Sequence, residues 1–593
     1  MLSTDVTEGN KAVLPDATGR DGQKPPGTNG ILLQAKGVTI HARTGASLLS
    51  DISFHIEPGE LVALTGVSYS GKSILLQCLA GLRPPTSGEI LIDGVNFYKN
   101  LKAFRTTIGF VPADFALSQS LTVTEIIQDG ATLRLPRRTS KQDRRERILN
   151  LLQTVGLAQV ADSRVGSLDR LQKRRLNIAI ELLGNPGLLV LDAPTEQLTP
   201  FEEVQISILL KELSRTGLTV IQVDPRARSA GMADKIIFLA PGGLLAWFGP
   251  TEEASGFLRG FIPRGVVKDL FGLKEAIEIL ANPQVEDGVK WAKRFRDHEA
   301  YQNYVDDPLH NRYPDLLLQT RPLMRLRLRS SLEEKLPPPI IPRANAVQKL
   351  ILLIRRTARL VWREKTILSM LAIPPLIALV DFAFSATMRA DPIRASIFFG
   401  TLVFLVLLTS GLLVQNEIFK ERTLYQYENR TTTLLFPYIL SKAWLVGMLA
   451  IYQGLVWTIM HFLATGMVEG PQILFSYGVT LFLIAFIGGM LGLLASAGSK
   501  RAMTTTSWLL LFTVPQLILS GAIIPVANPS FPFILLSAID PARYALQALL
   551  AIHGFVEGFR LPPSSDWFAL AIIGLCLIAL LAVIQQRVGS VRI

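Results

Sequence analysis

The residues best able to do chemistry lie in GVSYSGKS, which spans 66–73 and fits the pattern G-x-x-x-x-G-K-S. An apolar run, LVALTG, precedes this segment, and a helix-like run, ILLQCLAGL, follows it. In that context backbone N–H groups and the helix N-terminus form a positive nest for phosphate oxygens. The Lys72 amine would reach the β- and γ-phosphates, and the Ser73 hydroxyl would ligate Mg²⁺. The predicted phosphate site comprises Gly66, Val67, Ser68, Tyr69, Ser70, Gly71, Lys72, Ser73 and Ile74.

A second metal ligand is expected at the end of another apolar run, LLVLD, which covers 188–192. The carboxylate of its last residue, Asp192, would hold Mg²⁺ directly or through a water molecule. The glycine–lysine pattern also occurs by chance. The preceding strand, the following helix and this later carboxylate argue against a chance match at residues 66–73.

The elements that position these residues indicate an α/β domain over 31–250. Short apolar runs alternate with helical stretches, and several runs are continuously apolar, as strands covered on both faces must be. We predict a parallel sheet with helices on both sides. Residues 1–30 are expected to form a disordered tail without the apolar region of a signal peptide. Residues 251–345 are expected to be a charged, helical connector.

The part after residue 365 differs in composition. Hydrophobic residues make up 49% of the chain, and charged residues, 18% of the chain, are concentrated before residue 366. Six apolar stretches follow, each long enough to span about 30 Å of hydrocarbon. A soluble bundle of six buried helices is the alternative. The stretches are 366–388, 397–414, 435–463, 473–497, 507–527 and 567–585.

The cations flanking these stretches favour a membrane topology with both termini in the cytosol. Residues 346–365 are expected to form an interfacial amphipathic helix leading into the bilayer, with a solvated linker helix as the alternative. Ten cations fall on the cytosolic side: Arg363, Lys365, Lys420, Arg422, Arg430, Lys442, Lys500, Arg501, Arg587 and Arg592. Four fall on the other side: Arg389, Arg394, Arg543 and Arg560.

The net charge of +12 is compatible with nucleic acid or with anionic lipid as a partner. The sequence contains no nucleic-acid motif and no basic stripe interleaved with aromatic residues, so the lipid surface is favoured. The two cysteines, Cys78 and Cys576, are too few for a disulfide framework or a cysteine-based zinc site.

Further stretches give the chain a specific resemblance. PPTSGEILIDG (84–94), LTVTEII (121–127), LDAPT (191–195) and PGGLLAWFGP (241–250) lie in the first part. NEIFKERTLYQYE (416–428) and LILSGAIIP (517–525) lie in the second. Over about 31–593 the chain resembles an ABC transporter half-molecule of the ABCG (White) group.

The resemblance implies an α/β P-loop NTPase (ABC nucleotide-binding) domain over 31–250, followed by an all-α six-helix transmembrane domain over 366–593. It also implies a dimer that binds ATP and Mg²⁺, because ATP in this family lies between the phosphate loop of one domain and the signature of the other.

The sequence departs from the family at most positions that act in hydrolysis. The catalytic glutamate position falls on Ala193, the switch histidine on Pro225 and the Q-loop glutamine on Ala113. None of these side chains can orient a water molecule or hold a γ-phosphate. The family signature falls on Leu168, Asp169, Arg170, Leu171 and Gln172.

The altered signature is expected to bind a partner's nucleotide poorly. Asp169 would bring a negative charge toward a phosphate, and Arg170 and Leu171 add bulk where the backbone must come close. A homodimer would therefore have two impaired sites, and pairing with an intact half-transporter would still impair both. Tyr69 stands where the family usually has glycine, and His41 is the candidate for stacking on adenine.

The membrane part contains two groups of candidate residues. Asp381 lies inside the first apolar stretch, either in a transport path or at the outer interface beside a cation. After the second stretch come charged residues that the resemblance assigns to coupling with the nucleotide domain, the alternative being a solvated charge cluster. They are Glu417, Lys420, Glu421 and Arg422.

These observations predict an exporter-like membrane transporter subunit that binds Mg-ATP but is deficient in hydrolysis. The alternatives are a non-transporting scaffold for an intact half-transporter, a relic left by drift, and residual or partner-rescued turnover. The chain would act as a homodimer or heterodimer in the cell membrane, with its nucleotide domain in the cytosol. The transported substrate is unidentified, and no nucleic-acid partner is expected.

Overall fold

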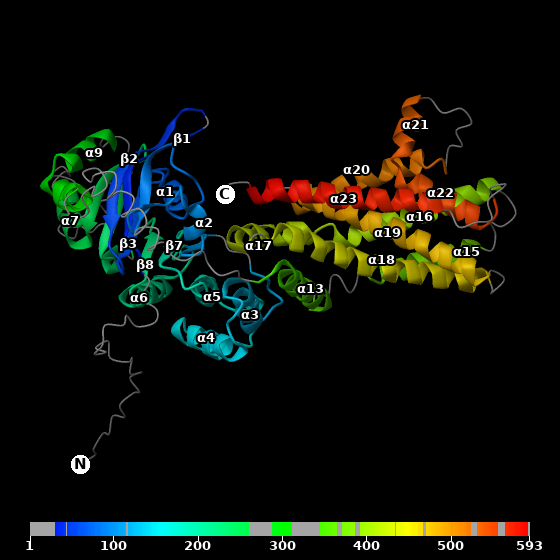
Figure 1. The fold of residues 1–593 in the computed structure, drawn as a ribbon, viewed down its shortest axis with the longest axis horizontal. Coiled ribbons are helices and arrows are strands. Elements are labelled where there is room, and N and C mark those ends of the chain that lie inside the picture. Colours follow the sequence, from blue (N-terminus) through cyan, green and yellow to red (C-terminus); the bar gives the residue numbers. More distant parts are fainter. Residues whose placement is uncertain are drawn as a thin grey trace, which may run out of the picture.

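The chain folds into a mixed α/β part at one end and a long helical bundle at the other (Figure 1). The computed structural model describes residues 30–42, 44–113, 117–228, 230–259, 288–310, 344–363, 371–385, 392–432, 434–465, 470–499, 501–522, 531–555 and 564–590. The predicted tail therefore lies outside the described residues except for Gly30.

A six-stranded sheet forms the centre of the α/β part. Its strand order is β10-β9-β3-β8-β7-β6, and every pairing is parallel except that between β9 and β10. The predicted parallel sheet is confirmed by these pairings, and β3 and β8 are buried along their whole length, as strands covered on both faces are. The strands are β3 (Leu61–Gly66), β6 (Ile108–Val111), β7 (Leu188–Leu191), β8 (Thr219–Val223), β9 (Lys235–Ala240) and β10 (Leu244–Pro250).

A second, antiparallel sheet was not predicted. Its order is β2-β1-β4-β5, formed by β1 (Leu33–His41), β2 (Ser47–Ile56), β4 (Ser87–Ile92) and β5 (Val95–Asn96). The expectation of one parallel sheet over 31–250 is thus incomplete. These strands mix polar and apolar residues, as in β1 (LQAKGVTIH), and β1 has register irregularities that blur its period.

The helices of the α/β part begin at residues that suit helix N-termini. Thr122, Ser140, Asp169 and Thr199 each accept a hydrogen bond from a backbone N–H in the first turn of the helix that follows. The helices are α1 (Lys72–Leu79), α2 (Leu101–Phe104), α3 (Val123–Arg134), α4 (Lys141–Thr154), α5 (Arg170–Leu182) and α6 (Pro200–Arg215).

The described parts of the expected connector pack on the α/β part. They form α7 (Thr251–Arg259), α9 (Gly288–Arg296), α10 (Glu299–Tyr301) and α11 (Asp307–His310). Phe295 of α9 is fully buried, with its ring 5.4 Å from that of Trp247 in β10. This stretch therefore extends the hydrophobic core around the six-stranded sheet.

The second part of the chain is helical. Among the described residues, four helices are long and apolar enough to cross a membrane, judged by length and composition. The helices are α13 (Ala346–Arg363), α15 (Ile373–Ser385), α16 (Pro392–Val414), α17 (Glu417–Thr432), α18 (Leu435–Thr465), α19 (Pro471–Gly498), α20 (Ala502–Leu519), α21 (Phe531–Ala538), α22 (Pro541–Ile552) and α23 (Ser564–Ser590).

Four predicted stretches coincide with long helices, namely α16, α18, α19 and α23. The stretch 507–527 is represented by the shorter α20, and 366–388 is described only from residue 371 to residue 385. Pro374 and Pro375 lie in the first turn of α15, where proline is tolerated, so no kink in mid-helix results. The sequence also missed α22, which packs against α16, α19 and α23.

Candidate nucleotide site and its junction with the helical bundle

The predicted phosphate loop joins β3 to α1, and two of its glycines are required by its geometry. Gly66 has φ 140° and Gly71 has φ 86°. A Cβ at Gly66 would come 2.2 Å from the carbonyl oxygen of Leu239, and one at Gly71 would come 2.7 Å from Leu49 Cδ2. Only glycine fits both the backbone conformation and the space at these two positions.

Lys72 is held inside the loop. Its Nζ donates to the carbonyl oxygens of Gly66, at 2.9 Å, and Val67, at 2.5 Å. Burial lowers the pKa of Lys72, and the nearby Asp192 carboxylate opposes that change. The amine thus lies at the mouth of the nest, where phosphate oxygens could replace the two carbonyls as acceptors.

Asp192 lies against the loop at the end of β7. The Ser73 hydroxyl is hydrogen-bonded to its carboxylate, which links the two predicted Mg²⁺ ligands. Burial and the charge of Glu196 raise the pKa of Asp192, while Ser73, Arg174 and Lys72 act in the opposite direction. The hydroxyl and carboxylate oxygens are hard ligands of the type that Mg²⁺ prefers, so this set fits the cation.

Replacing Asp192 with asparagine is expected to raise the melting temperature of the nucleotide-free protein at neutral pH. The pKa of Asp192 is higher in the folded protein than in the unfolded chain. Its contribution to the free energy of unfolding is therefore fully present below the unfolded-state pKa. That contribution is lost as the pH rises through the folded-state pKa. The gap between Asp192→Asn and the native protein should therefore widen above about pH 4. The Asp192→Asn variant should also lose the rise in melting temperature that Mg-ATP gives the native protein. Thermal unfolding across pH, with and without Mg-ATP, tests both effects. An unchanged response to Mg-ATP would contradict the role of Asp192 as an Mg²⁺ ligand.

The other loop residues lie around this centre. Tyr69 adopts φ 63° and its side chain is fully exposed, so a bulky residue occupies a backbone conformation that favours glycine. Ser70 is buried, Ser68 is exposed and Ile74 is half-buried in α1. His41, proposed to stack on adenine, is exposed at the end of β1.

Asp169 caps the helix that it precedes. Its Oδ1 accepts a hydrogen bond from Gln172 N at 2.7 Å, and Gln172 Oε1 accepts one from Asp169 N at 3.1 Å. This reciprocal capping engages the carboxylate with the N-terminus of its own helix, α5. The exposed Arg170 donates from Nη1 to the carbonyl oxygen of Gln197 at 2.9 Å. Leu168 is buried, and Leu171 packs partly against the core.

The positions matched to the family's hydrolytic residues carry no base or switch side chain. Ala193 directly follows Asp192, has φ 46° and is 5% exposed. Pro225 follows the buried Asp224, which accepts a hydrogen bond from Arg226 N. Ala113 lies two residues after the end of β6. Its carbonyl oxygen accepts a hydrogen bond from Arg174 Nη1 at 2.5 Å.

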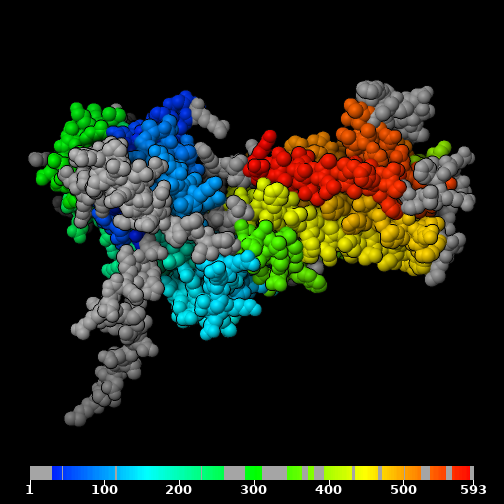
Figure 2. Space-filling model, in the orientation of Figure 1, coloured from blue at the N-terminus to red at the C-terminus, as the bar shows by residue number. Residues whose placement is uncertain are grey.

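A buried network of arginines and carboxylates joins the α/β part to the bundle. Arg356 of α13 donates from Nε to Asp129 of α3 at 3.1 Å. The two terminal nitrogens of Arg356 bond both carboxylate oxygens of Glu428 in α17, at 2.9 and 3.0 Å. Arg359 also bonds Asp129, and Arg363 bonds Glu125. Figure 2 shows α13 at this junction, between the nucleotide-site part and the bundle.

Three of the four residues predicted to couple the parts line a cavity between the bundle and the α/β part. Glu417 and Glu421 bond the buried Lys442 of α18 at 3.3 and 2.9 Å. Arg422 Nη1 donates to Ser499 O at 3.1 Å. Glu417, Lys420 and Glu421 line this cavity of about 200 Å³, together with Arg356 and the loop at Ser118.

Residues further along α17 make direct contacts with the α/β part. The Arg134 guanidinium lies 5.2 Å from the centre of the Tyr427 ring, and Arg105 Nη2 donates to Asn429 O at 3.0 Å. Tyr427 belongs to the hydrophobic cluster around α3, α4 and α5. Sequence reasoning missed these contacts, although the polar helix NEIFKERTLYQYENR continues through them. Asp381 lies in α15, and its side chain is outside the described residues.

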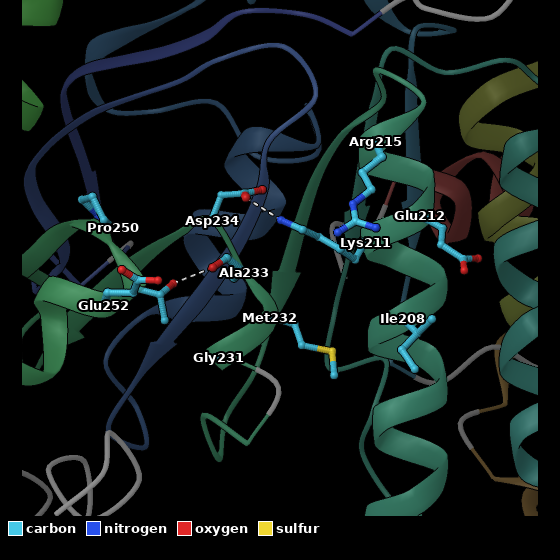
Figure 3. Close-up of a pocket in the computed structure, with 11 residues that line it drawn as sticks. Ile208, Lys211, Glu212, Arg215, Gly231, Met232, Ala233, Asp234, Pro250 and Glu252 are labelled. Atoms are coloured by element: carbon cyan, nitrogen blue, oxygen red, sulfur yellow. Dashed lines mark hydrogen bonds and ion pairs between the residues drawn. The ribbon is translucent and has the colours of Figure 1, made fainter. Parts of the chain in front are cut away.

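Another cavity, of about 660 Å³, lies away from the phosphate loop (Figure 3). Lys211 of α6 bonds Asp234 at its edge, and Met232 lines it. Asp234 precedes the first residue of β9, whereas Gly66 ends the parallel strand β3. The cavity is therefore at the sheet edge opposite the phosphate loop and is not the predicted nucleotide site.

Comparisons with known proteins agree with this arrangement. Residues 49–196 match the model of the ABC transporter family, and residues 348–553 match that of the ABC-2 type transporter family. The chain is 27% identical over 568 residues to the ABC transporter ATP-binding/permease protein Rv1747 of Mycobacterium tuberculosis, covering 90% of this chain and 59% of that protein.

Relatives of the G group match over a smaller share of the chain. Identity is 33% over 264 residues with the broad substrate specificity transporter ABCG2 of Bos taurus, covering 41% of this chain and 39% of ABCG2. It is 35% over 216 residues with ABC transporter G family member 22 of Arabidopsis thaliana, covering 35% and 28% respectively. In each of these three comparisons the chain spans less than two thirds of the relative's length.

Proposed function

We propose that this chain, an ABC-type half-transporter with its nucleotide-binding domain before its transmembrane domain, is an exporter-like subunit that binds Mg-ATP but hydrolyses it poorly. One observation carries the proposal. Lys72, Ser73 and Asp192 converge on the phosphate loop, while Ala193 follows Asp192 where the family's general base would lie.

The size of the expected defect follows from what each missing group does. Removing one preorganised group that stabilises the transition state commonly costs about 10²–10³ in rate. The positions at Ala193, Pro225 and Ala113 all lack their family side chains, although such losses are not additive. Binding depends on other groups, namely the loop amides, Lys72 and the Ser73–Asp192 pair. The chain is therefore expected to keep Mg-ATP binding while it loses most of its ATP hydrolysis.

The subunit is proposed to work as a homodimer or as a heterodimer with another ABC half-transporter in the cell membrane, with the nucleotide domain in the cytosol. α13 is proposed to lie at the membrane surface. Its arginines are used in ion pairs with α3 and α17, while Trp362 is 78% exposed and Val347 65% exposed. Exposed apolar residues beside charged ones suit the headgroup region of a bilayer. The transported substrate stays unidentified.

ATP binding and turnover of the purified full chain in lipid nanodiscs test this function. We expect Mg-ATP binding that Lys72→Ala weakens by more than about tenfold, because the amine supplies a charge-assisted phosphate contact. We expect phosphate release no faster than in Lys72→Ala. Turnover clearly above that control would contradict the proposed deficiency. Absence of binding would contradict the proposed Mg-ATP site.

Co-purification distinguishes the proposed exporter subunit from the scaffold alternative. An exporter subunit should assemble with itself or with a hydrolysing half-transporter and support ATP-dependent movement of cargo in sealed vesicles. A scaffold should assemble with that partner and alter its turnover, and Lys72→Ala should leave this effect unchanged.

A further inference from the structure

Two of the six histidines in the chain meet inside the helical bundle. His461 belongs to α18, and His553 directly follows α22. Their Nε2 atoms lie 3.2 Å apart, although the residues are 92 positions apart in sequence. Neither residue takes part in the nucleotide site or in the junction with α13.

The hydrogen-bond pattern fixes which ring nitrogens carry protons. His553 Nδ1 lies 2.8 Å from the carbonyl oxygen of Leu549. A carbonyl can only accept, so Nδ1 of His553 carries a proton, and in the neutral imidazole Nε2 then has a lone pair. His461 Nε2–H therefore donates to His553 Nε2. Donation of the far ring N–H to a backbone carbonyl is also the arrangement found in metal-ligating histidines.

Aromatic neighbours hold both rings in place. The His461 ring stacks on Tyr477 of α19, with centroids 4.2 Å apart and an interplanar angle of 21°. The His553 ring lies 4.7 Å from the ring of Phe399 in α16, at 33°. The two imidazoles meet at 82° to each other. Four helical elements thus fix the direction of the two Nε2 atoms.

The helix α22, which His553 directly follows, lies toward the end of the bundle far from the α/β part (Figure 1). His461 follows Lys442 by 19 residues on the same helix, which corresponds to about 28 Å along the axis. His461 is 4% exposed, whereas His553 is half-buried beside an exposed Gly554. An ion can therefore reach His553 without crossing the bundle.

We propose that His461 and His553 form a binding site for a transition-metal ion that favours imidazole, such as Zn²⁺. Two imidazole nitrogens bonded to tetrahedral Zn²⁺ at about 2.0–2.1 Å lie about 3.3–3.4 Å apart, close to the observed 3.2 Å. On binding, His461 Nε2 gives up its proton to solvent and Nδ1 takes one up, so both imidazoles stay neutral. Each Nε2 then donates its lone pair to the ion.

Water would complete the coordination. Among the described residues no cluster of three or more His, Cys, Asp or Glu side chains has the geometry of a metal site. A two-imidazole site of this kind exchanges its ion more readily than a closed four-ligand site. Its effect would be mechanical, because the ion would bond α18 to α22 at the outer end of the bundle. This inference does not depend on ATP binding.

Zn²⁺ and Co²⁺ titration of the purified full chain in nanodiscs tests the site without measuring activity. We expect Zn²⁺ to raise the thermal unfolding temperature, and Co²⁺ to show the strong visible absorption of tetrahedral coordination. His461→Gln and His553→Gln should each weaken both responses by more than about tenfold, because a lost ligand costs at least as much as a lost ligand-orienting group. The matched control is His298→Gln. His298 is an exposed residue that directly precedes α10 in the α/β part, so this variant should bind metal like the native protein.

The outcomes separate a metal site from a plain hydrogen bond. A pair that only bonds α18 to α22 would lower the unfolding temperature when mutated but would show no metal response in the native protein, which overturns the proposal. Equal responses in His461→Gln and the native protein would also overturn it. If the glutamine variants do not fold, His553→Cys retains a ligand and should bind Co²⁺ with thiolate charge-transfer absorption; its absence would count against the site.

Discussion

Replacing Arg356 with methionine is expected to lower the free energy of unfolding by about 3–5 kcal/mol, because it removes one partner from a buried ion-pair network. Arg356 is 8% exposed and bonds carboxylates on two other elements, Asp129 of α3 and Glu428 of α17. Burial lowers the pKa of Arg356, but the two carboxylates outweigh burial and hold it above the ordinary arginine value. Thermal unfolding in detergent or nanodiscs measures the loss.

The neighbouring Arg355 provides the matched control, because it lies on the same helix with an exposed side chain. Arg355→Met should change stability by no more than about 0.5 kcal/mol. Pairing Arg356→Met with Glu428→Met should recover part of the loss, since removing both partners leaves fewer unsatisfied charges. If Arg356→Met unfolds at the same temperature as Arg355→Met, the network does not hold the two parts together.

Restoring the general base and the signature together is expected to raise the rate of ATP turnover by about 10²–10³ over that of the native chain. Ala193→Glu alone should have little effect, because the signature positions still differ. Adding Asp169→Ser, Arg170→Gly and Leu171→Gly would restore a signature with room for close backbone approach. It would also remove the carboxylate that now caps α5. Phosphate release in nanodiscs, at saturating Mg-ATP, is the measurement.

The control is the same combination of substitutions together with Lys72→Ala, which should show no ATP turnover above background. Rescue by Ala193→Glu alone would show that the native signature supports hydrolysis, which contradicts the proposed double defect. If the combined variant folds and binds ATP but stays inactive, Ala193 and the signature are not the changes that limit hydrolysis, which contradicts the expected rescue.

Several features of the fold could be predicted because they depend on short-range patterns. The phosphate loop was found from the types and spacing of its glycines and Lys72, flanked by a strand and a helix. The long apolar helices α16, α18, α19 and α23 were found because spanning a bilayer demands uninterrupted apolar residues. The helix α22 was missed, since it lies in a segment with prolines and polar residues.

The sequence left the partners of charged residues open at two places. The Asp169 carboxylate caps α5 through Gln172 N, and its expected effect on a partner's phosphate stays a prediction. Glu417 and Glu421 bond Lys442 in the bundle and also line the cavity against the α/β part, so their expected coupling role stays a prediction. The sequence reveals the charge of a side chain but not its partner, and the partner determines what the charge does.

The sequence by itself determined the two-part order of the chain, and it predicts the phosphate loop and the replacement of the hydrolytic side chains. These follow from residue type and near-neighbour spacing. Only the tertiary structure decided that Arg356 bonds Asp129, 227 positions away, and that His461 meets His553. Such pairings depend on how helices pack against one another, and packing is set by the whole fold rather than by any local pattern.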